Sequence, residues 1–172
     1  MNVEIVLTAH TRWWLRLLNW LGARMKWTHA LLLFYEDEPS DGYIVEAAEW
    51  GVAKRDWDPS EFEDYGRFQL KPEQFTGDLH RQYATAKMQY FTLGEVGKRY
   101  KYEALGLIAL RILRRIRRPR VGSRLIGTGE VCTSLVDRTL LSVGFDLLPG
   151  EDSPFILPDE IARSQLLVRI YP

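Results

Sequence analysis

Cys132 is the only cysteine of the chain and the residue whose type and position point most directly to chemistry. The apolar residues beside it recur at helical spacing up to Gly144, a residue type that commonly follows the end of a helix. They are Val131, Leu135, Val136, Leu140 and Val143. We therefore expect Cys132 in the first turn of a mostly buried helix. The unpaired N–H groups and positive dipole end of that turn stabilise a thiolate, which is the nucleophilic form of cysteine.

A free cysteine often only packs in a core, so a nucleophile needs further support from the sequence. His29 stands near the start of an apolar run, and Glu46 lies inside another one. A carboxylate in an apolar strand is costly unless it has a partner, although a lone histidine there is commonly a core residue. A cysteine hydrolase requires a thiol at a helix N-terminus, an imidazole within reach and a group that orients the imidazole. Cys132, His29 and Glu46 meet this need if the helix packs against the strands.

The elements that must position these residues follow from the hydrophobic pattern. We expect strands at 3–7, 27–35, 43–48, 51–55, 65–70 and 166–170, and helices at 11–25, 72–93, 100–118, from about 132, and at 158–162. Strands 27–35 and 43–48 are predicted to form a hairpin around the acidic turn 36–42. The segment 92–97 is expected to break its helix, and 121–129 and 145–154 are expected to be loops. No linker divides the chain, so residues 1–172 are predicted to form a single domain.

Four motifs resemble those of the circularly permuted papain-fold cysteine hydrolases, the permuted branch of the NlpC-type superfamily that includes the YiiX-like group. They are Trp-Thr-His-Ala-Leu-Leu at 27–32, Val-Glu-Ala at 45–47, Gly-Lys-Arg-Tyr-Lys-Tyr-Glu-Ala-Leu at 97–105 and Cys-Thr-Ser-Leu-Val at 132–136. The segment Leu-Pro-Asp-Glu-Ile-Ala at 157–162 resembles a further one. Each motif alone is weak, but their order and gaps match the family across nearly the whole chain.

The resemblance implies an α+β fold, in which a small antiparallel sheet or barrel packs against the helix that bears the cysteine. It also implies Cys132 as nucleophile, His29 as general base, Glu46 as the residue that orients it, and Tyr100 near the oxyanion. The chain departs from the family at several positions: Thr133 and Ser134 stand where Ser and Glu are common, and Lys101 stands where an acid is common. These departures leave the three catalytic candidates intact and put substrate preference in doubt.

The charge is divided between two segments although the net charge is zero. Residues 36–64 carry a net charge of −9 and residues 98–124 one of +9. The basic run 111–124 could serve an anionic substrate or simply be a solvated helix end; because no aromatics are interleaved with it, we expect no nucleic-acid partner. The remaining histidines, His10 and His80, are interpreted as loop and surface residues. We expect neither a metal nor a cofactor, because no ligand cluster or phosphate-binding motif is present.

The start of the chain lacks the features of a signal peptide, and no apolar run is long enough to cross a membrane. We therefore expect a cytoplasmic protein, or a phage-encoded one that acts in the host cell. The expected activity is cleavage of an amide or ester through a thioester, with a small peptide or lipid-like acyl substrate. A peptidoglycan amidase or peptidase, a lipid acyltransferase or thioesterase at a membrane surface, and a non-catalytic interaction module that kept the fold all remain open. The tryptophan-rich helix 11–25 is predicted to pack in the core, with a membrane-surface contact as the alternative.

Overall fold

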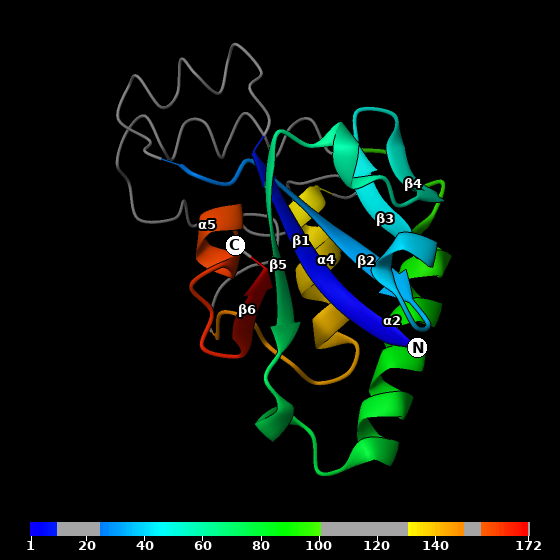
Figure 1. The fold of residues 1–172 in the computed structure, drawn as a ribbon, viewed down its shortest axis with the longest axis vertical. Coiled ribbons are helices and arrows are strands. Elements are labelled where there is room, and N and C mark those ends of the chain that lie inside the picture. The colour runs from blue at the N-terminus through cyan, green and yellow to red at the C-terminus, as the bar shows by residue number, and fades with distance from the viewer. Residues whose placement is uncertain (10–24, 101–130, 150–155, 172) are drawn as a thin grey trace.

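In the part of the chain that the structure describes, a six-stranded antiparallel sheet is the central element (Figure 1). The computed structural model describes residues 1–9, 25–100, 131–149 and 156–171. Within them the strand order is β4-β3-β2-β1-β5-β6. The strands are β1 (Asn2–Ala9), β2 (His29–Tyr35), β3 (Tyr43–Ala48), β4 (Gly51–Asp56), β5 (Asp64–Leu70) and β6 (Leu167–Tyr171).

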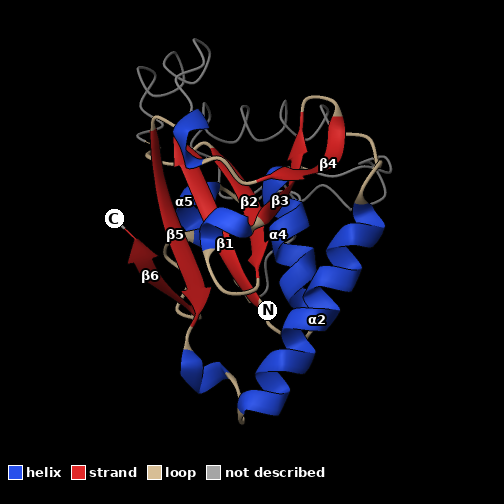
Figure 2. Ribbon diagram, turned by 45° about the vertical axis from the view of Figure 1, so that its right-hand side comes forward, coloured by secondary structure: helices blue, strands red, loops and turns tan. Residues whose placement is uncertain are grey.

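The helices gather mainly on one side of this sheet (Figure 2). They are α2 (Asp78–Glu95), α4 (Cys132–Leu141) and the short α5 (Pro158–Ile161), with 3₁₀ turns η1 (Pro39–Asp41), η2 (Pro59–Glu61) and η3 (Pro72–Gln74). Helix α4 contacts β2 and β3, and α2 packs against α4. Helix α2 also reaches the sheet directly, since Gln89 donates to the Tyr43 hydroxyl of β3 and Arg81 donates to Asn2 of β1. None of the described helices has the length and apolar composition that crossing a membrane requires.

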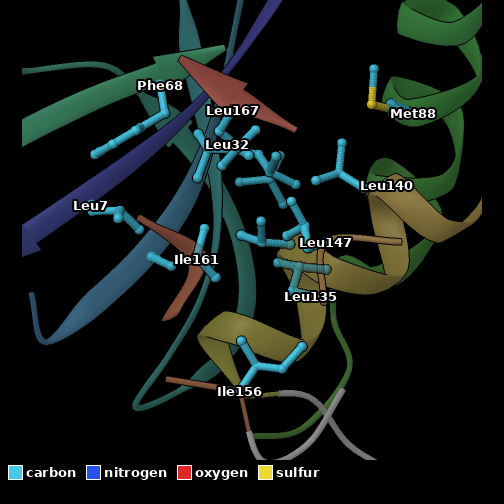
Figure 3. Packing of buried hydrophobic residues seen from close by; sticks show 14 of the residues in the cluster. Leu7, Leu32, Phe68, Met88, Leu135, Leu140, Leu147, Ile156, Ile161 and Leu167 are labelled. Carbon is cyan, nitrogen blue, oxygen red and sulfur yellow. The ribbon is translucent and has the colours of Figure 1, made fainter. Parts of the chain in front are cut away.

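Each face of the sheet has its own hydrophobic cluster because side chains alternate along the strands. The helix-side cluster contains Leu32 from the sheet and Leu135 and Leu140 from α4 (Figure 3). Val45 of β3 belongs to the same cluster, and all four residues are at most 2% exposed. The opposite cluster contains Val6, Leu31, Leu33, Tyr35, Ile44, Trp57 and Phe62. This two-sided burial explains why β2 reads as an unbroken apolar run rather than as an alternating one.

All six predicted strands are present, whereas the start of one predicted helix was wrong. The helix predicted from Pro72 begins at Asp78, because Pro72 starts the turn η3 instead. The predicted break at 92–97 is confirmed, because α2 ends within that segment, at Glu95, two residues beyond the expected Leu93. The buried Thr92 hydroxyl in the last turns of α2 donates to the Met88 carbonyl and contacts the Thr139 hydroxyl of α4 at 3.0 Å, which ties this end of the helix to α4. The helix then ends before Gly97, whose φ of 89° favours glycine.

The predicted helices at 11–25 and 100–118, the basic run 111–124 and the predicted loop 121–129 lie outside the described residues, apart from their edges. The described part is therefore α+β with an open antiparallel sheet packed against the cysteine-bearing helix.

Candidate functional site

The thiol of Cys132 stands on the first residue of α4. Val131 before it has extended backbone, and its N–H donates to Ser134 Oγ at 2.9 Å, so a side chain three residues later caps the helix start. The Cys132 residue is 8% exposed, and Leu135 and Val136 on the following turn are fully buried. The apolar spacing seen in the sequence thus fixes which side of α4 faces the sheet, and with it the position of the sulfur.

The sheet opens where α4 begins. The β1–β2 pairing continues to His29, which is opposite Thr8, but the β2–β3 pairing stops at Leu31 opposite Glu46. Ala30 therefore has no partner in the β2–β3 ladder, and its backbone N–H bonds to the Cys132 sulfur. At this end of β2, the first residue of α4 thus takes the hydrogen bond that a residue of β3 would otherwise accept.

This opening explains how residues from two faces of the sheet meet. By alternation, His29 and Glu46 share the face of Leu31 and Ile44, whereas α4 covers the face of Leu32 and Val45. A continuous ladder would separate them from the helix. The β2–β3 ladder ends at Leu31 and does not include Ala30. The sulfur can therefore reach the imidazole around the end of this strand pair.

His29 links the sulfur to the carboxylate. Its Nε2 lies 2.7 Å from Glu46 Oε2, and the two side chains are 14% and 10% exposed. The imidazole also hydrogen-bonds the Cys132 side chain. Since Nε2 is used by Glu46, Nδ1 is the nitrogen left for the sulfur. The three candidates from the sequence are therefore in contact as a chain from thiol to imidazole to carboxylate.

The electrostatics of the chain favour a thiolate–imidazolium pair. Burial alone would raise the pKa of Cys132, but the charge and hydrogen bond of His29, followed by the N–H groups of Ala30 and Thr133, lower it. Burial opposes the charged form of His29 as well, yet Cys132 and then Glu46 raise the pKa of the imidazole to about 10. Burial would raise the pKa of Glu46, whereas His29 and Arg55 lower it to about 2.

Arg55 also belongs to this network, although no motif in the sequence marks it. Its Nε donates to Glu46 Oε1 at 2.7 Å, and its Nη1 forms an ion pair with Glu61. A signal was present in the sequence: once β3 and β4 are read as a hairpin, alternation places Arg55 on the face of Glu46.

Tyr100 is half-buried and packs against the helix-side cluster. The residues before it are tied to the start of β4, because Val52 N–H donates to the Lys98 carbonyl at 2.8 Å and Gly97 N–H donates to the Val52 carbonyl at 2.8 Å. Ala47, next to Glu46, is the register partner of Val52. Tyr100 thus follows a segment fixed beside the end of β3 that carries Glu46, and its oxyanion role stays a prediction.

The remaining histidines do not extend the site. His80 lies on α2 against the rings of Phe75 and Phe145, with Thr76 N–H donating to its Nδ1 at 3.2 Å. His10 is outside the described residues. Among residues that are described, no group of three or more His, Cys, Asp and Glu side chains is arranged to hold a metal ion.

A scan against protein-family models and a search of curated proteins gave no match to this chain. The site is therefore interpreted from its own geometry. A thiol of lowered pKa, hydrogen-bonded to an imidazole that a carboxylate holds, has the parts required for nucleophilic attack followed by proton return to a leaving group.

Proposed function

We propose that this protein is a cysteine hydrolase or acyl-transfer enzyme that cleaves an amide or ester through a thioester on Cys132. The observation that carries the proposal is the position of the His29 imidazole, which bonds the sulfur on one side and the Glu46 carboxylate, at 2.7 Å, on the other. The lowered pKa of Cys132 supports the same assignment. A cysteine that only packs in a core has no use for a base held in this way.

The residues divide the reaction among them. The Cys132 thiolate attacks the carbonyl carbon, and the carbonyl electron pair moves to the oxygen. Collapse of this intermediate breaks the bond to the amine or alcohol, which takes the proton from the His29 imidazolium, and a thioester remains. Water or an amine then gives a proton to His29 and attacks the thioester, which releases the thiolate. The backbone N–H of Cys132, at the start of α4, is suited to bind the oxyanion.

The family we propose is the permuted papain-type group of NlpC-like hydrolases. The chain order supports it: the histidine strand and the carboxylate strand both precede the cysteine helix, and the helix packs on those two strands. Within that group the substrate we favour is a small peptide-like amide, with a peptidoglycan stem as one example and a lipid-like acyl ester as the other. Tyr100 is proposed as a further oxyanion or substrate residue.

The competing proposal is a non-catalytic module that kept the fold. The observation that favours it is burial, since Cys132 is only 8% exposed and the His29 side chain only 14%. An enzyme of this kind requires its sulfur to be reached by a carbonyl. Access to the sulfur is thus the property that separates the two proposals.

Alkylation of Cys132 measures that access directly, and the chain offers a clean readout because it has no other cysteine. We expect iodoacetamide to modify the protein at about pH 6 nearly as fast as at about pH 8.5, since the thiolate is the reacting form. We also expect p-nitrophenyl acetate to leave one acetyl group on Cys132 by intact-protein mass spectrometry. The Cys132→Ala variant should take up neither label, and His29→Gln should react only at alkaline pH. If the wild-type thiol reacted only at alkaline pH, the proposal of a cysteine enzyme would be wrong.

A further inference from the structure

The carboxylate of Glu46 is held from two sides, and each side uses a different oxygen. Oε2 lies 2.7 Å from the His29 imidazole, and Oε1 accepts from Arg55 Nε at 2.7 Å. The side chain of Glu46 is 10% exposed, so the protein itself supplies most of the partners that water would otherwise give. A carboxylate with a fixed partner on each oxygen has one orientation, whereas a carboxylate that loses one partner can rotate away from the other.

The sheet register dictates this contact. Glu46 is opposite Ala53, and Ile44 is opposite Arg55 in the β3–β4 pair. Arg55 therefore stands on the same face as Glu46 and two residues along the neighbouring strand, a diagonal distance that a long side chain spans. The hairpin register therefore places Arg55 within reach of Glu46.

Arg55 is in turn held by its surroundings. Its Nη1 pairs with Glu61 at the end of η2, and the guanidinium lies 5.7 Å from the centre of the Phe62 ring. The turn η2 is itself fixed, because Asp58 accepts from the Ser60 N–H at its start. The planar guanidinium can serve Glu46 and Glu61 at once, which an ammonium group does poorly.

We propose that Arg55 is a positioning residue of the site: it fixes the Glu46 carboxylate so that Oε2 faces His29, and it thereby acts on Cys132 through Glu46. This inference rests on the proposed function, because it assigns Arg55 a role in the reactivity of the thiol. Glu61 supports the same arrangement from the far side of the guanidinium.

A second arginine–glutamate pair of the same sheet provides the matched control. Arg67 of β5 binds the buried Glu4 of β1 through two nitrogens, and its side chain is 19% exposed. Glu4 is opposite Leu33, whereas His29 is opposite Thr8 at the other end of β1. Removing Arg67 thus breaks a comparable ion pair away from the thiol.

The experiment records the rate of Cys132 alkylation by iodoacetamide against pH, which requires no substrate. The titratable and charged groups that face one another along the network are Cys132, His29, Glu46, Arg55 and Glu61. In Arg55→Gln we expect the rise of the rate to move to higher pH and the rate near neutral pH to fall several-fold, as a less supported imidazolium stabilises the thiolate less. Arg67→Gln should leave the profile where it is.

Double variants decide whether Arg55 acts through Glu46. Arg55→Gln should shift the profile in the wild-type background and cause little further shift in a Glu46→Ala background. Arg55→Lys keeps the positive charge but loses the planar guanidinium, so it should give an intermediate shift of the pH–rate profile. This variant provides the measurement if Arg55→Gln does not fold. Circular dichroism of each variant checks the fold.

Two results overturn the inference. The first is a pH–rate profile of Arg55→Gln that coincides with that of wild type, or such a profile of Arg55→Lys if only that variant folds. The second is a pH shift caused by Arg55→Gln that is as large in the Glu46→Ala background as in the wild type. Neither result contradicts the proposed function, since the thiol would still be activated. A wild-type thiol that reacts only at alkaline pH overturns both proposals together. The two failures are therefore distinguishable from one series of measurements.

Discussion

At the scale of single residues, the chemistry of Glu46 is constrained because its two oxygens serve two donors. A glutamine has one carbonyl oxygen and can accept from His29 or from Arg55, but not from both in the same way. We expect Glu46→Gln to keep the fold and to lower the rate of Cys132 acetylation by p-nitrophenyl acetate on the order of 10²-fold or more.

The control for this variant is Glu49→Gln, which changes the same residue type in the exposed turn that follows β3. It should leave the acetylation rate within a factor of two or so, as expected of a surface change. Equal rates in Glu46→Gln and wild type would move the orienting role to another group.

The same carboxylate makes stability depend on pH. Its pKa is lowered from 4.5 to about 2 in the folded protein. A depressed folded-state pKa means that the stabilisation is present above the unfolded value and is lost as the pH falls from about 4.5 towards about 2. We expect the free energy of unfolding in urea to fall over that window less steeply in Glu46→Gln than in wild type. Parallel curves for the two proteins would show that Glu46 contributes nothing to this dependence.

At the scale of elements, the start of α4 is the structure on which the sulfur depends. Ser134 Oγ accepts from the Val131 N–H at 2.9 Å, which satisfies one unpaired donor of the helix end. We expect Ser134→Ala to lower the free energy of unfolding by about 1 kcal/mol and to slow Cys132 alkylation near neutral pH, because the first turn frays.

Ser142→Ala at the other end of α4 is the comparison. There the hydroxyl donates to the Thr139 carbonyl at 2.7 Å, away from Cys132. It should affect alkylation little, whatever it does to stability. If both serine variants slowed alkylation equally, the effect would be a general loss of stability and not a loss of the helix start.

The strands could be predicted because their causes are local. β1 and β2 are apolar runs between polar segments, and the hairpin of β2 and β3 follows from the breakers between them. The exact end of α2 could not, because contacts with α4 help to hold its last turn: Thr92 contacts Thr139, and Glu95 pairs with Arg138 at 3.5 Å as well as with the local Lys98 at 2.6 Å. Tertiary contacts there outweigh the local signal of Gly94.

For the candidate site as well, some features could be predicted from the sequence and others could not. Cys132, His29 and Glu46 could be named from residue type and from the order of the motifs that hold them. The end of the β2–β3 ladder at Leu31 could not be predicted, because it depends on whether α4 or β3 supplies a partner for Ala30. Arg55 was missed for a related reason: its partner is set by register, which the sequence fixes only after the hairpin is known.

At the scale of the whole molecule, the exposed acidic turn and the candidate site lie at opposite ends of β2. The acidic turn after β2, with Glu36, Asp37 and Glu38 exposed, is at the opposite end of that strand from His29. Part of the same acidic segment enters the site as Glu46, where Arg55 and His29 neutralise it. The exposed negative charge of the turn is thus kept a full strand length away from the thiol.

The basic run 111–124 lies outside the described residues, but it precedes Cys132 closely in the sequence, and we predict that it borders the site and draws in anions. Two alkylating agents that differ in charge test this without a known substrate. At low ionic strength, replacing Arg114, Arg115, Arg117 and Arg118 with glutamine should lower the rate with anionic iodoacetate several-fold and leave the rate with neutral iodoacetamide nearly unchanged.

The difference should disappear at high salt, where charges interact over only about 3 Å at 1 M. Neutralising Glu36, Asp37 and Glu38 in the distant acidic turn should not change the ratio of the two rates, because that turn is at the far end of β2. An unchanged ratio in the four-arginine variant would identify the basic run as a solvated helix end. A ratio that falls only in that variant would assign the site a preference for anionic substrates and would place the positive field beside the thiol.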